Sequence, residues 1–464
     1  MAIYNLDLPT FKQNFDVSKA DKLEYGEIYT PWALIHKMLD LFEPAVFKQP
    51  QKCWLDIGAG PGYFSIVLFE RLNQGLADII PDPMTRKQHI VEKMLAMVEL
   101  KEQNVCALKT MFGEKANIIA GDFLAEDSIT KEYDYIIGNP PYNAHGMKKV
   151  PTNKKTQKKQ DGTTVWMAFV KKALRLLKPE VGQLCLIVPS IWLKPDKAGI
   201  HQVLTSYKIE KLHCLSGNET NRLFNGEAQT PTCYFLLTKR ETDQVIGLFD
   251  SLRQLYVPFA YPSAGKPIPV FGATIVQKVQ KWIAIAGTAL HIIKTNMPPA
   301  KSKFTEMPYN AEYPYINIKS CLLERLQPVL LVNYSDVPQV FHGVKKLVLA
   351  HKMYGFPYFD KAGTYGISNR DNYVIVGKTD TEFMQLQAFL STKFALYLFE
   401  ATRYRMKYLE KYTFQLLPDI TKLPNFPPAA AITDESVADY FELDDTDKLH
   451  IKSLHRRDYS RFFC

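Results

Sequence analysis

The sequence lacks the features that mark membrane proteins and disulfide-stapled secreted domains. No apolar run approaches the roughly 20 residues that a membrane-spanning helix needs, and the first twenty residues are mixed and polar, unlike a signal peptide. The seven cysteines are odd in number and form no C-x-x-C pair; they are Cys53, Cys106, Cys185, Cys214, Cys233, Cys321 and Cys464. We therefore expect buried free thiols, no metal site, no membrane contact and a cytoplasmic location.

No internal repeat is present either, and the composition is that of an ordinary globular protein. The chain has 464 residues, of which 46% are hydrophobic and 23% charged. This length allows two or three domains with substantial cores. The formal net charge of +9 favours a polyanionic partner without establishing one.

The positive charge is concentrated in residues 143–164. This polar, glycine-containing stretch holds six lysines against one acidic residue, Asp161; the lysines are Lys148, Lys149, Lys154, Lys155, Lys158 and Lys159. Such a run cannot pack into a core, so we expect a solvated loop. The stretch directly follows the motif Asn139-Pro140-Pro141-Tyr142, and this position also favours contact with phosphate groups.

The most distinctive motif is Asn139-Pro140-Pro141-Tyr142, which follows an apolar run at residues 133–138. The run predicts a short buried strand that must end abruptly, because proline cannot continue a sheet ladder. The motif therefore lies at the carboxyl end of a strand, where ligands bind in open α/β sheets. The plainer interpretation is a stiff turn with an aromatic side chain as its plug.

A second motif combines a strand, a glycine loop and a helix. The strand is expected over residues 52–57 and is followed by Gly58-Ala-Gly60-Pro-Gly62. This order is typical of the opening of a nucleotide-binding α/β domain. The spacing is G-x-G-x-G and Asp56 precedes it, so a cationic or hydroxyl-bearing ligand is favoured over a pyrophosphate.

Polar side chains recur at the predicted strand ends. Asp56, Glu99 and Asp122 close or follow three strands, and Asn139 follows the fourth. Core packing alone does not readily produce this regularity, although one exposed acid at a strand end is unremarkable. We therefore expect one ligand cleft, in which Glu99 is placed to bind ribose hydroxyls.

Three further segments of this region carry weaker signals. Thr30 as N-cap and Pro31 at the first helical position predict the start of an amphipathic helix. Residues 73–91 are interpreted as a polar insertion without periodicity. The last strand of the sheet is expected at residues 230–238, and the alternation of strands and helices stops near residue 245.

Beyond residue 245, aromatic, proline and β signals interleave with basic residues. A long helix is expected over residues 382–400, followed by a basic and aromatic cluster that contains Arg403 and Arg405. This mixture suits a nucleic-acid surface, and a β-sheet core with a solvated rim would explain part of it. The expected division is residues 1–244, residues 245–425, and a linker with an acidic helical tail at residues 426–464.

Taken together, these residues resemble the γ-class DNA adenine-N6 methyltransferases of restriction-modification systems. In that family the cofactor region, the Asn-Pro-Pro-Tyr motif and a carboxyl-terminal target-recognition domain occur in this order. The resemblance implies an α/β fold, with a Rossmann-like S-adenosylmethionine methyltransferase sheet carrying helices on both faces, followed by a mixed α+β target-recognition domain. It implies double-stranded DNA as partner, at the nucleoid or wherever the target DNA resides. A companion restriction endonuclease on a separate chain is compatible with the sequence.

The resemblance also assigns roles to individual residues. Thr30 and Pro31 would close over the methionine end of S-adenosylmethionine. The cofactor loop would comprise Asp56, Gly58, Gly60 and Gly62, with Glu99 at the ribose and Asp122 and Phe123 at the adenine. Asn139, Pro140, Pro141 and Tyr142 would form the catalytic motif, and Phe224 would be a second stacking aromatic. DNA contacts would come from the six loop lysines, Arg403 and Arg405.

The implied activity is that of a site-specific, adenine-specific DNA methyltransferase (EC 2.1.1.72 type), acting on a flipped-out adenine. Asn-Pro-Pro-Tyr also serves methyl transfer to RNA adenines and to a protein glutamine amide, but those enzymes usually lack a second domain of this size. A non-catalytic DNA-specificity protein on the same scaffold is a further alternative. The intact acids and Asn139 argue against it.

Replacing the six loop lysines with alanine is expected to weaken DNA binding and to flatten its salt dependence, because each phosphate contact releases a counterion. Binding isotherms at several salt concentrations measure the slope. An unchanged slope would show that the loop does not contact phosphate.

Overall fold

The computed structural model describes residues 29–125, 129–143, 164–226, 228–261, 265–307, 310–324, 327–351, 355–405 and 409–454. The six loop lysines lie outside these ranges. The chain divides into two units, Met1–Phe249 and Asp250–Cys464. No helix in the described ranges is long and apolar enough to span a membrane. Among the same residues, no group of His, Cys, Asp and Glu side chains is arranged to hold a metal ion.

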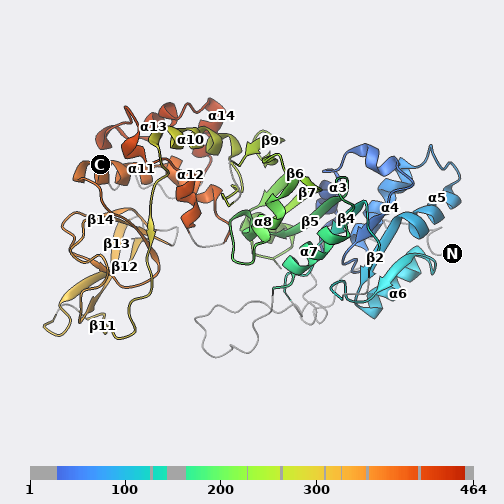
Figure 1. The fold of residues 1–464 in the computed structure, drawn as a ribbon, viewed down its shortest axis with the longest axis horizontal. Coiled ribbons are helices and arrows are strands. Elements are labelled where there is room, and N and C mark those ends of the chain that lie inside the picture. The colour runs from blue at the N-terminus through green and yellow to red at the C-terminus, as the bar shows by residue number, and fades with distance from the viewer. Residues whose placement is uncertain are drawn as a thin grey trace. The chain divides into compact units, whose positions relative to one another are not determined.

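A nine-stranded sheet runs in the order β3-β2-β1-β4-β5-β7-β6-β8-β9 (Figure 1). β1 pairs in parallel with β2 and β4, and β4 with β5, whereas β7 is antiparallel to β5 and β6. The strands are β1 (Trp54–Asp56), β2 (Leu95–Glu99), β3 (Asn117–Ala120), β4 (Tyr135–Gly138), β5 (Gln183–Pro189), β6 (Tyr207–Leu215), β7 (Thr232–Glu241), β8 (Val245–Asp250) and β9 (Leu255–Ala260). The predicted Rossmann-like sheet is confirmed.

The central strands are buried along their whole length, which is the pattern of parallel strands covered by helices. Every residue of β1, β2 and β4 is buried. Helices connect the strands; they are α3 (Trp32–Leu39), α4 (Tyr63–Gly75), α6 (Glu102–Phe112), α7 (Trp166–Leu176), α8 (Ile200–Thr205) and α9 (Gly217–Leu223). Trp54 lies in the core they cover, stacked on Tyr135 at a ring distance of 4.2 Å.

The structure corrects two expectations for the first half of the chain. The sheet does not end with β7, because β8 continues it, pairing in parallel with β6 through Lys211 and Gly247. Residues 73–91 contain the expected polar loop at Pro81 and Asp82, but they also contain helical residues that were not predicted. α4 continues to Gly75, and α5 (Pro83–His89) begins where the Asp82 side chain accepts the Thr85 N–H at 2.7 Å. A capped helix this short has too few turns to show a period.

The second unit contains two four-stranded sheets and five helices in its described part. The sheet orders are β10-β17-β14-β15 and β11-β13-β12-β16. Their strands are β10 (Ile293–Lys294), β11 (Phe304–Thr305), β12 (Tyr315–Glu324), β13 (Gln327–Ser335), β14 (Lys346–Ala350), β15 (Tyr358–Asp360), β16 (Gly366–Ile367) and β17 (Asn372–Ile375). The helices are α10 (Ala273–Ala286), α11 (Asp380–Leu390), α12 (Lys393–Ala401), α13 (Asp434–Tyr440) and α14 (Asp445–Lys452). The predicted mixed α+β composition is confirmed.

Helices account for most differences from expectation in this unit. α10 was not predicted, although Ile275, Val276 and Val279 form its buried stripe. The predicted helix over residues 382–400 is two helices. α12 has its own N-cap, Thr392, whose side chain accepts the Ala395 N–H at 3.1 Å.

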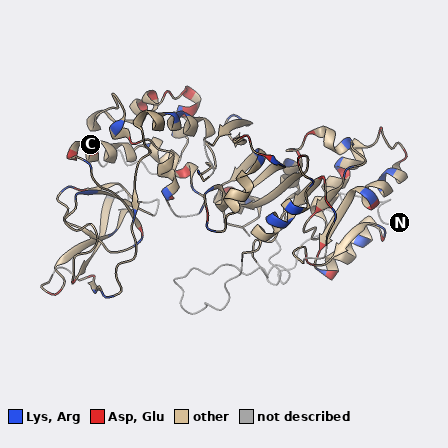
Figure 2. Ribbon diagram, in the orientation of Figure 1, with Lys and Arg blue, Asp and Glu red and all other residues tan. Residues whose placement is uncertain are grey.

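The acidic residues near the end of the chain do not form a tail. α14 is held to α10 because Asp447 is fully buried and accepts hydrogen bonds from Thr274 at 2.8 Å and Lys278 at 2.7 Å. Arg253 lies 3.2 Å from the same carboxylate. Phe394 of α12 also stacks on Phe441, at a ring distance of 5.2 Å. Figure 2 shows acidic and basic residues close together along these helices.

Asp447→Ala should lower the free energy of unfolding by about 3 kcal/mol, because Arg253 and Lys278 lose a buried partner. Urea unfolding measures this change. Asp445→Ala, two residues earlier and exposed, is the matched control and should have little effect. Equal stability of the two variants would contradict a structural role for the Asp447 cluster.

Candidate functional site

The carboxyl ends of β1, β2 and β4 meet at one edge of the sheet. Asp56 pairs with Met97 of β2 and with Ile137 of β4, so Glu99 and Asn139 each lie two positions farther toward that edge. The edge extends to β3, since Glu99 pairs with Ala120 and its carbonyl accepts the Gly121 N–H at 2.9 Å. The strand ends that the sequence indicated are therefore adjacent.

Asp56 is a buried carboxylate at the centre of this edge. It is fully inaccessible, and Oδ2 accepts a hydrogen bond from the Ser65 hydroxyl at 2.8 Å. Oδ1 accepts no hydrogen bond of ordinary geometry from the described residues. Burial raises the pKa of Asp56 to about 7; the Ser65 hydrogen bond opposes this rise and the charge of Glu99 adds to it. Ser65 was not singled out from the sequence.

The three glycines of the loop have different structural roles. Gly60 and Gly62 have φ of +55° and +101°, which other residues rarely adopt. A Cβ on Gly62 would also lie 2.9 Å from Leu108 Cδ2 of α6. A Cβ on Gly58 would meet nothing within 4 Å. Gly62 thus permits helix packing, whereas Gly58 exposes the backbone to open space that a ligand can enter.

Glu99 is tied to the glycine loop. Its Oε2 accepts the Gly60 N–H at 2.8 Å, and its Oε1 accepts the Lys101 N–H at 2.8 Å and Asn104 Nδ2 at 3.3 Å. These donors fix the carboxylate beside the loop at the end of β2. The strand end and the glycine loop consequently form one rigid structure.

Three aromatic rings cover the loop, and the sequence reasoning missed them. Tyr63 makes edge contacts with Tyr29 and Trp32, at ring distances of 5.1 and 4.8 Å. Tyr29 Cε1 lies 3.9 Å from the position of a Cβ on Gly60. The available signal was positional, since Tyr63 directly follows Gly62 and Tyr29 directly precedes Thr30.

Asn139 is joined to the segment before α3. Its Nδ2 donates to Thr30 Oγ1 at 3.1 Å. Thr30 is therefore not the helix N-cap that was predicted. Pro31 occupies that position, and its carbonyl accepts the N–H groups of Leu34 and Ile35 at 2.9 and 3.1 Å. The hydroxyl of Thr30 contacts the carboxamide of Asn139 instead of the helix.

Gly138 lets the motif approach β1. Its φ is +146°, and a Cβ there would lie 3.2 Å from Ile57 Cγ1 and 3.4 Å from Asp56 Oδ1. A larger residue would be strained at this φ and would crowd the Ile57 side chain. Glycine thus suits the close packing of the end of β4 against β1.

The rest of the motif leads into the lysine-containing segment. Pro140 is buried, Pro141 exposed and Tyr142 half-buried. The Tyr142 carbonyl accepts the Val165 N–H at 3.1 Å, and Asn143 forms a β-bridge with Thr164. The two ends of the segment between them therefore lie together, beside the motif.

The start of β7 reaches the same edge. Pro189 at the end of β5 pairs with Thr232, and the Ser190 N–H donates to the Pro231 carbonyl at 2.9 Å. Burial raises the pKa of Tyr142 above its usual range, with a smaller contribution from Cys233 of β7. Phe224 is buried on the connection between α9 and β7.

Asp122 and Phe123, the two residues expected to bind the adenine of the cofactor, differ in burial. Asp122 is exposed, and its Oδ1 accepts the Leu124 N–H at 2.8 Å. Phe123 is buried and stacks on Phe169 of α7 at a ring distance of 5.2 Å, with Lys172 Nζ 5.3 Å from its ring centre. The ring of Phe123 is thus part of the interior between β3 and α7.

The two arginines expected to contact DNA belong to the second unit. Arg403 Nη1 donates to both carboxylate oxygens of Glu400, at 3.2 and 3.1 Å. Arg405 is exposed, with its Nε 3.6 Å from Glu410 Oε1. Only Arg405 therefore presents much of its side chain to solvent.

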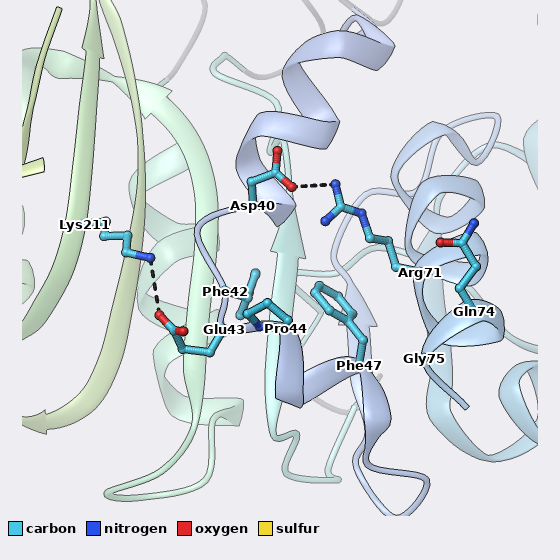
Figure 3. A pocket seen from close by; sticks show the side chains of 9 residues that line it. All are labelled: Asp40, Phe42, Glu43, Pro44, Phe47, Arg71, Gln74, Gly75 and Lys211. Atoms are coloured by element: carbon cyan, nitrogen blue, oxygen red, sulfur yellow. Dashed lines mark ion pairs between the residues drawn. The ribbon is translucent and has the colours of Figure 1, made fainter. Parts of the chain in front are cut away.

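A cavity of about 450 Å³ lies elsewhere in the first unit, at the carboxyl ends of α3 and α4 (Figure 3). Two ion pairs flank it, Asp40 with Arg71 at 2.7 Å and Glu43 with Lys211 at 3.5 Å. None of the site residues predicted from the sequence lines it. The strand-end site lies at the opposite, amino ends of these helices.

Comparison with known proteins identifies the relatives of this region. Residues 66–220 match the Eco57I restriction-modification methylase family. An uncharacterised adenine-specific methylase of Mycoplasma pneumoniae is 36% identical over 83 residues, which are 17% of this chain and 20% of that protein. The chain thus matches only a fifth of the length of its curated relative. The resemblance predicted from the sequence is confirmed in this region.

Solved structures of similar fold come from the same class of systems. The type IIL restriction-modification enzyme MmeI, in complex with DNA, is 12% identical, with 86% of this chain and 69% of that one covered and a TM-score of 0.48. A methyltransferase subunit of a type I restriction-modification system from Streptococcus thermophilus is 17% identical. That match covers 55% of this chain and 53% of the other, with a TM-score of 0.36.

The raised pKa of Asp56 predicts a pH dependence of stability. In the unfolded chain the carboxyl ionises near pH 4, whereas in the folded chain it stays protonated up to about pH 7. Its contribution to the free energy of unfolding should therefore fall, by up to roughly 4 kcal/mol, as the pH rises through this window.

Asp56→Asn removes this titration, so the variant should gain stability relative to the wild type between pH 4 and 7. Urea unfolding at several pH values measures the difference. Asp445→Asn, at the exposed start of α14, controls for the loss of a surface carboxylate. A constant difference between Asp56→Asn and the wild type would contradict the raised pKa.

Proposed function

We propose that this chain, whose residues 66–220 match the Eco57I restriction-modification methylase family, is a site-specific DNA methyltransferase. It would transfer a methyl group from S-adenosylmethionine to N6 of an adenine in double-stranded DNA. One observation carries the proposal. The carboxamide of Asn139 lies at the same sheet edge as the glycine loop and Glu99, and is joined to Thr30 at 3.1 Å.

The residues at this edge fit S-adenosylmethionine. Glu99 is held beside the loop by the Gly60 N–H and would accept hydrogen bonds from the ribose hydroxyls. The open space at Gly58 would admit the ligand close to the backbone. When bound, the cofactor supplies an electrophilic methyl group on a sulfonium centre.

Asn139 and Pro140 would prepare the amine that attacks. The exocyclic N6 of adenine is a poor nucleophile, because its lone pair is delocalised into the ring. The Asn139 side-chain oxygen and the Pro140 carbonyl would each accept one N6 hydrogen, which holds the lone pair out of conjugation and directs it at the methyl group. The fixed φ of proline aims the carbonyl. The transfer is direct, and the N6 proton leaves afterwards, so no cysteine is needed.

The target adenine must leave the duplex to reach this edge, because a stacked base is inaccessible. Tyr142 follows the prolines and is half-buried, so part of its ring can stack on an extruded base. Burial keeps its hydroxyl neutral by raising its pKa. Phe224 would be a second stacking partner, on the connection that leads into β7 at this edge.

The remaining parts of the chain would bind the duplex. The six loop lysines follow the motif in sequence and would contact phosphates. Residues 245–425 would form the target-recognition domain, in which exposed side chains such as Arg405 contact DNA and others read base edges. A nuclease activity would come from a companion endonuclease. The two additional sheets of the second unit favour DNA over an RNA or protein-glutamine substrate.

Asn139→Ala should abolish methyl transfer, since the N6 group loses an acceptor, while cofactor binding stays nearly unchanged. Sequencing DNA from cells that express each variant, with detection of modified adenines, reports activity, base and recognition site together. Asn117→Ala, at the amino end of β3, is the matched control and should modify DNA like the wild type. Retained activity in Asn139→Ala would refute the role of Asn139.

A further inference from the structure

The hydroxyl of Thr30 bonds to the side-chain nitrogen of Asn139 across 109 positions of sequence. We propose that Thr30 is a positioning residue that holds the Asn139 carboxamide with its oxygen turned toward the substrate amine. This rests on the proposed function for the identity of the amine. The hydrogen bond between the two side chains is observed in the structure and does not depend on that function.

A carboxamide needs such a partner because it has two nearly equivalent orientations. The terminal torsion of asparagine is broad and roughly two-fold, so the backbone at position 139 does not decide where oxygen and nitrogen point. A hydrogen bond to the nitrogen end decides it. With Nδ2 donating to Thr30, the oxygen is the end left for an N–H donor of the substrate.

The surroundings of Thr30 suit this role. Thr30 is 5% exposed, so water competes little with its hydrogen bond. The preceding residue, Tyr29, packs on Tyr63 and faces Gly60. The following residue, Pro31, starts α3. The hydroxyl is therefore fixed on one side by the glycine loop and on the other by a helix.

Residues 29–31 thus connect the two halves of the site. Tyr29 contacts the glycine loop, and Thr30 contacts the amide at the end of β4. Displacement of the segment would release the Asn139 carboxamide at the same time as it uncovers the loop. A direct contact of Thr30 with the cofactor would instead make it a binding residue. Loss of a positioning residue lowers turnover, whereas loss of a binding residue weakens cofactor binding.

Three variants separate these roles. Thr30→Val keeps the shape and removes the hydroxyl, Thr30→Ser restores the hydroxyl, and Thr110→Val removes an exposed helix hydroxyl as the matched control. With saturating cofactor and a duplex that carries the recognition site, kcat of Thr30→Val should fall about tenfold or more, since misorientation of a reacting group is costly. Thr30→Ser should recover most of kcat. A positioning role requires the cofactor Kd, from tryptophan fluorescence, to stay within about twofold of the wild type, whereas a role in closing over the cofactor would raise this Kd.

A double-mutant cycle tests the bond without any activity. The unfolding equilibrium is measured for the wild type, Thr30→Val, Asn139→Ala and the double variant. If the two side chains are hydrogen-bonded, the unfolding equilibrium constant of the double variant should differ by about fivefold from the value expected for two independent effects. Additive effects would overturn the proposal, as would an unchanged kcat in Thr30→Val or a loss confined to cofactor Kd. If the wild type modifies no DNA while the cycle shows coupling, the proposed function fails and the bond stands.

Discussion

The site depends on the parallel pairing of β1 with its neighbours β2 and β4. Because parallel strands end at one edge, side chains from segments far apart in sequence become neighbours there. The register fixes their relative height, with Asp56 beside Met97 and Ile137 and the next residues of each strand beyond it. Gly138, at φ +146°, favours this packing, because a Cβ there would crowd Ile57. Backbone geometry thus brings Asn139 to this edge of the sheet.

Electrostatics then distinguishes the two acids at this edge. Asp56 is buried, and its pKa is raised to about 7 by burial and by the nearby charge of Glu99. Glu99 receives two backbone N–H groups at 2.8 Å, which stabilise a carboxylate. The hydrogen-bonded pair of Asp56 and Ser65 therefore supports the loop in the protein interior. Glu99 provides a hydrogen-bond acceptor beside the loop. A ligand with hydroxyl groups and a positive centre complements these two acids better than a phosphate does.

Much of the first unit follows from local sequence rules. Apolar runs at residues 52–57 and 133–138 predicted β1 and β4, and the polar residues at the strand ends predicted the edge at which they gather. Other features depend on long-range contacts that no local pattern contains. The Thr30 hydroxyl was assigned to a helix cap, which is its most frequent local use, but in the fold it bonds to Asn139. The stacking of Phe123 on Phe169 likewise joins residues far apart in sequence. The acidic residues at the end of the chain were expected in a helical tail, and the partners of Asp447, Arg253 and Lys278, could not be predicted because they are far away in sequence.

The central claim is that the strand-end edge, with Asn139 at its rim, is the cofactor pocket. The most direct test is a crystal structure of the full chain with S-adenosylhomocysteine, the demethylated product. The ribose hydroxyls should lie within about 3.2 Å of the Glu99 carboxylate, with the sulfur directed toward the Asn139 carboxamide. A nucleoside bound instead between Asp40, Arg71 and Lys211, or an Asn139 side chain facing away from the sulfur, would contradict the account.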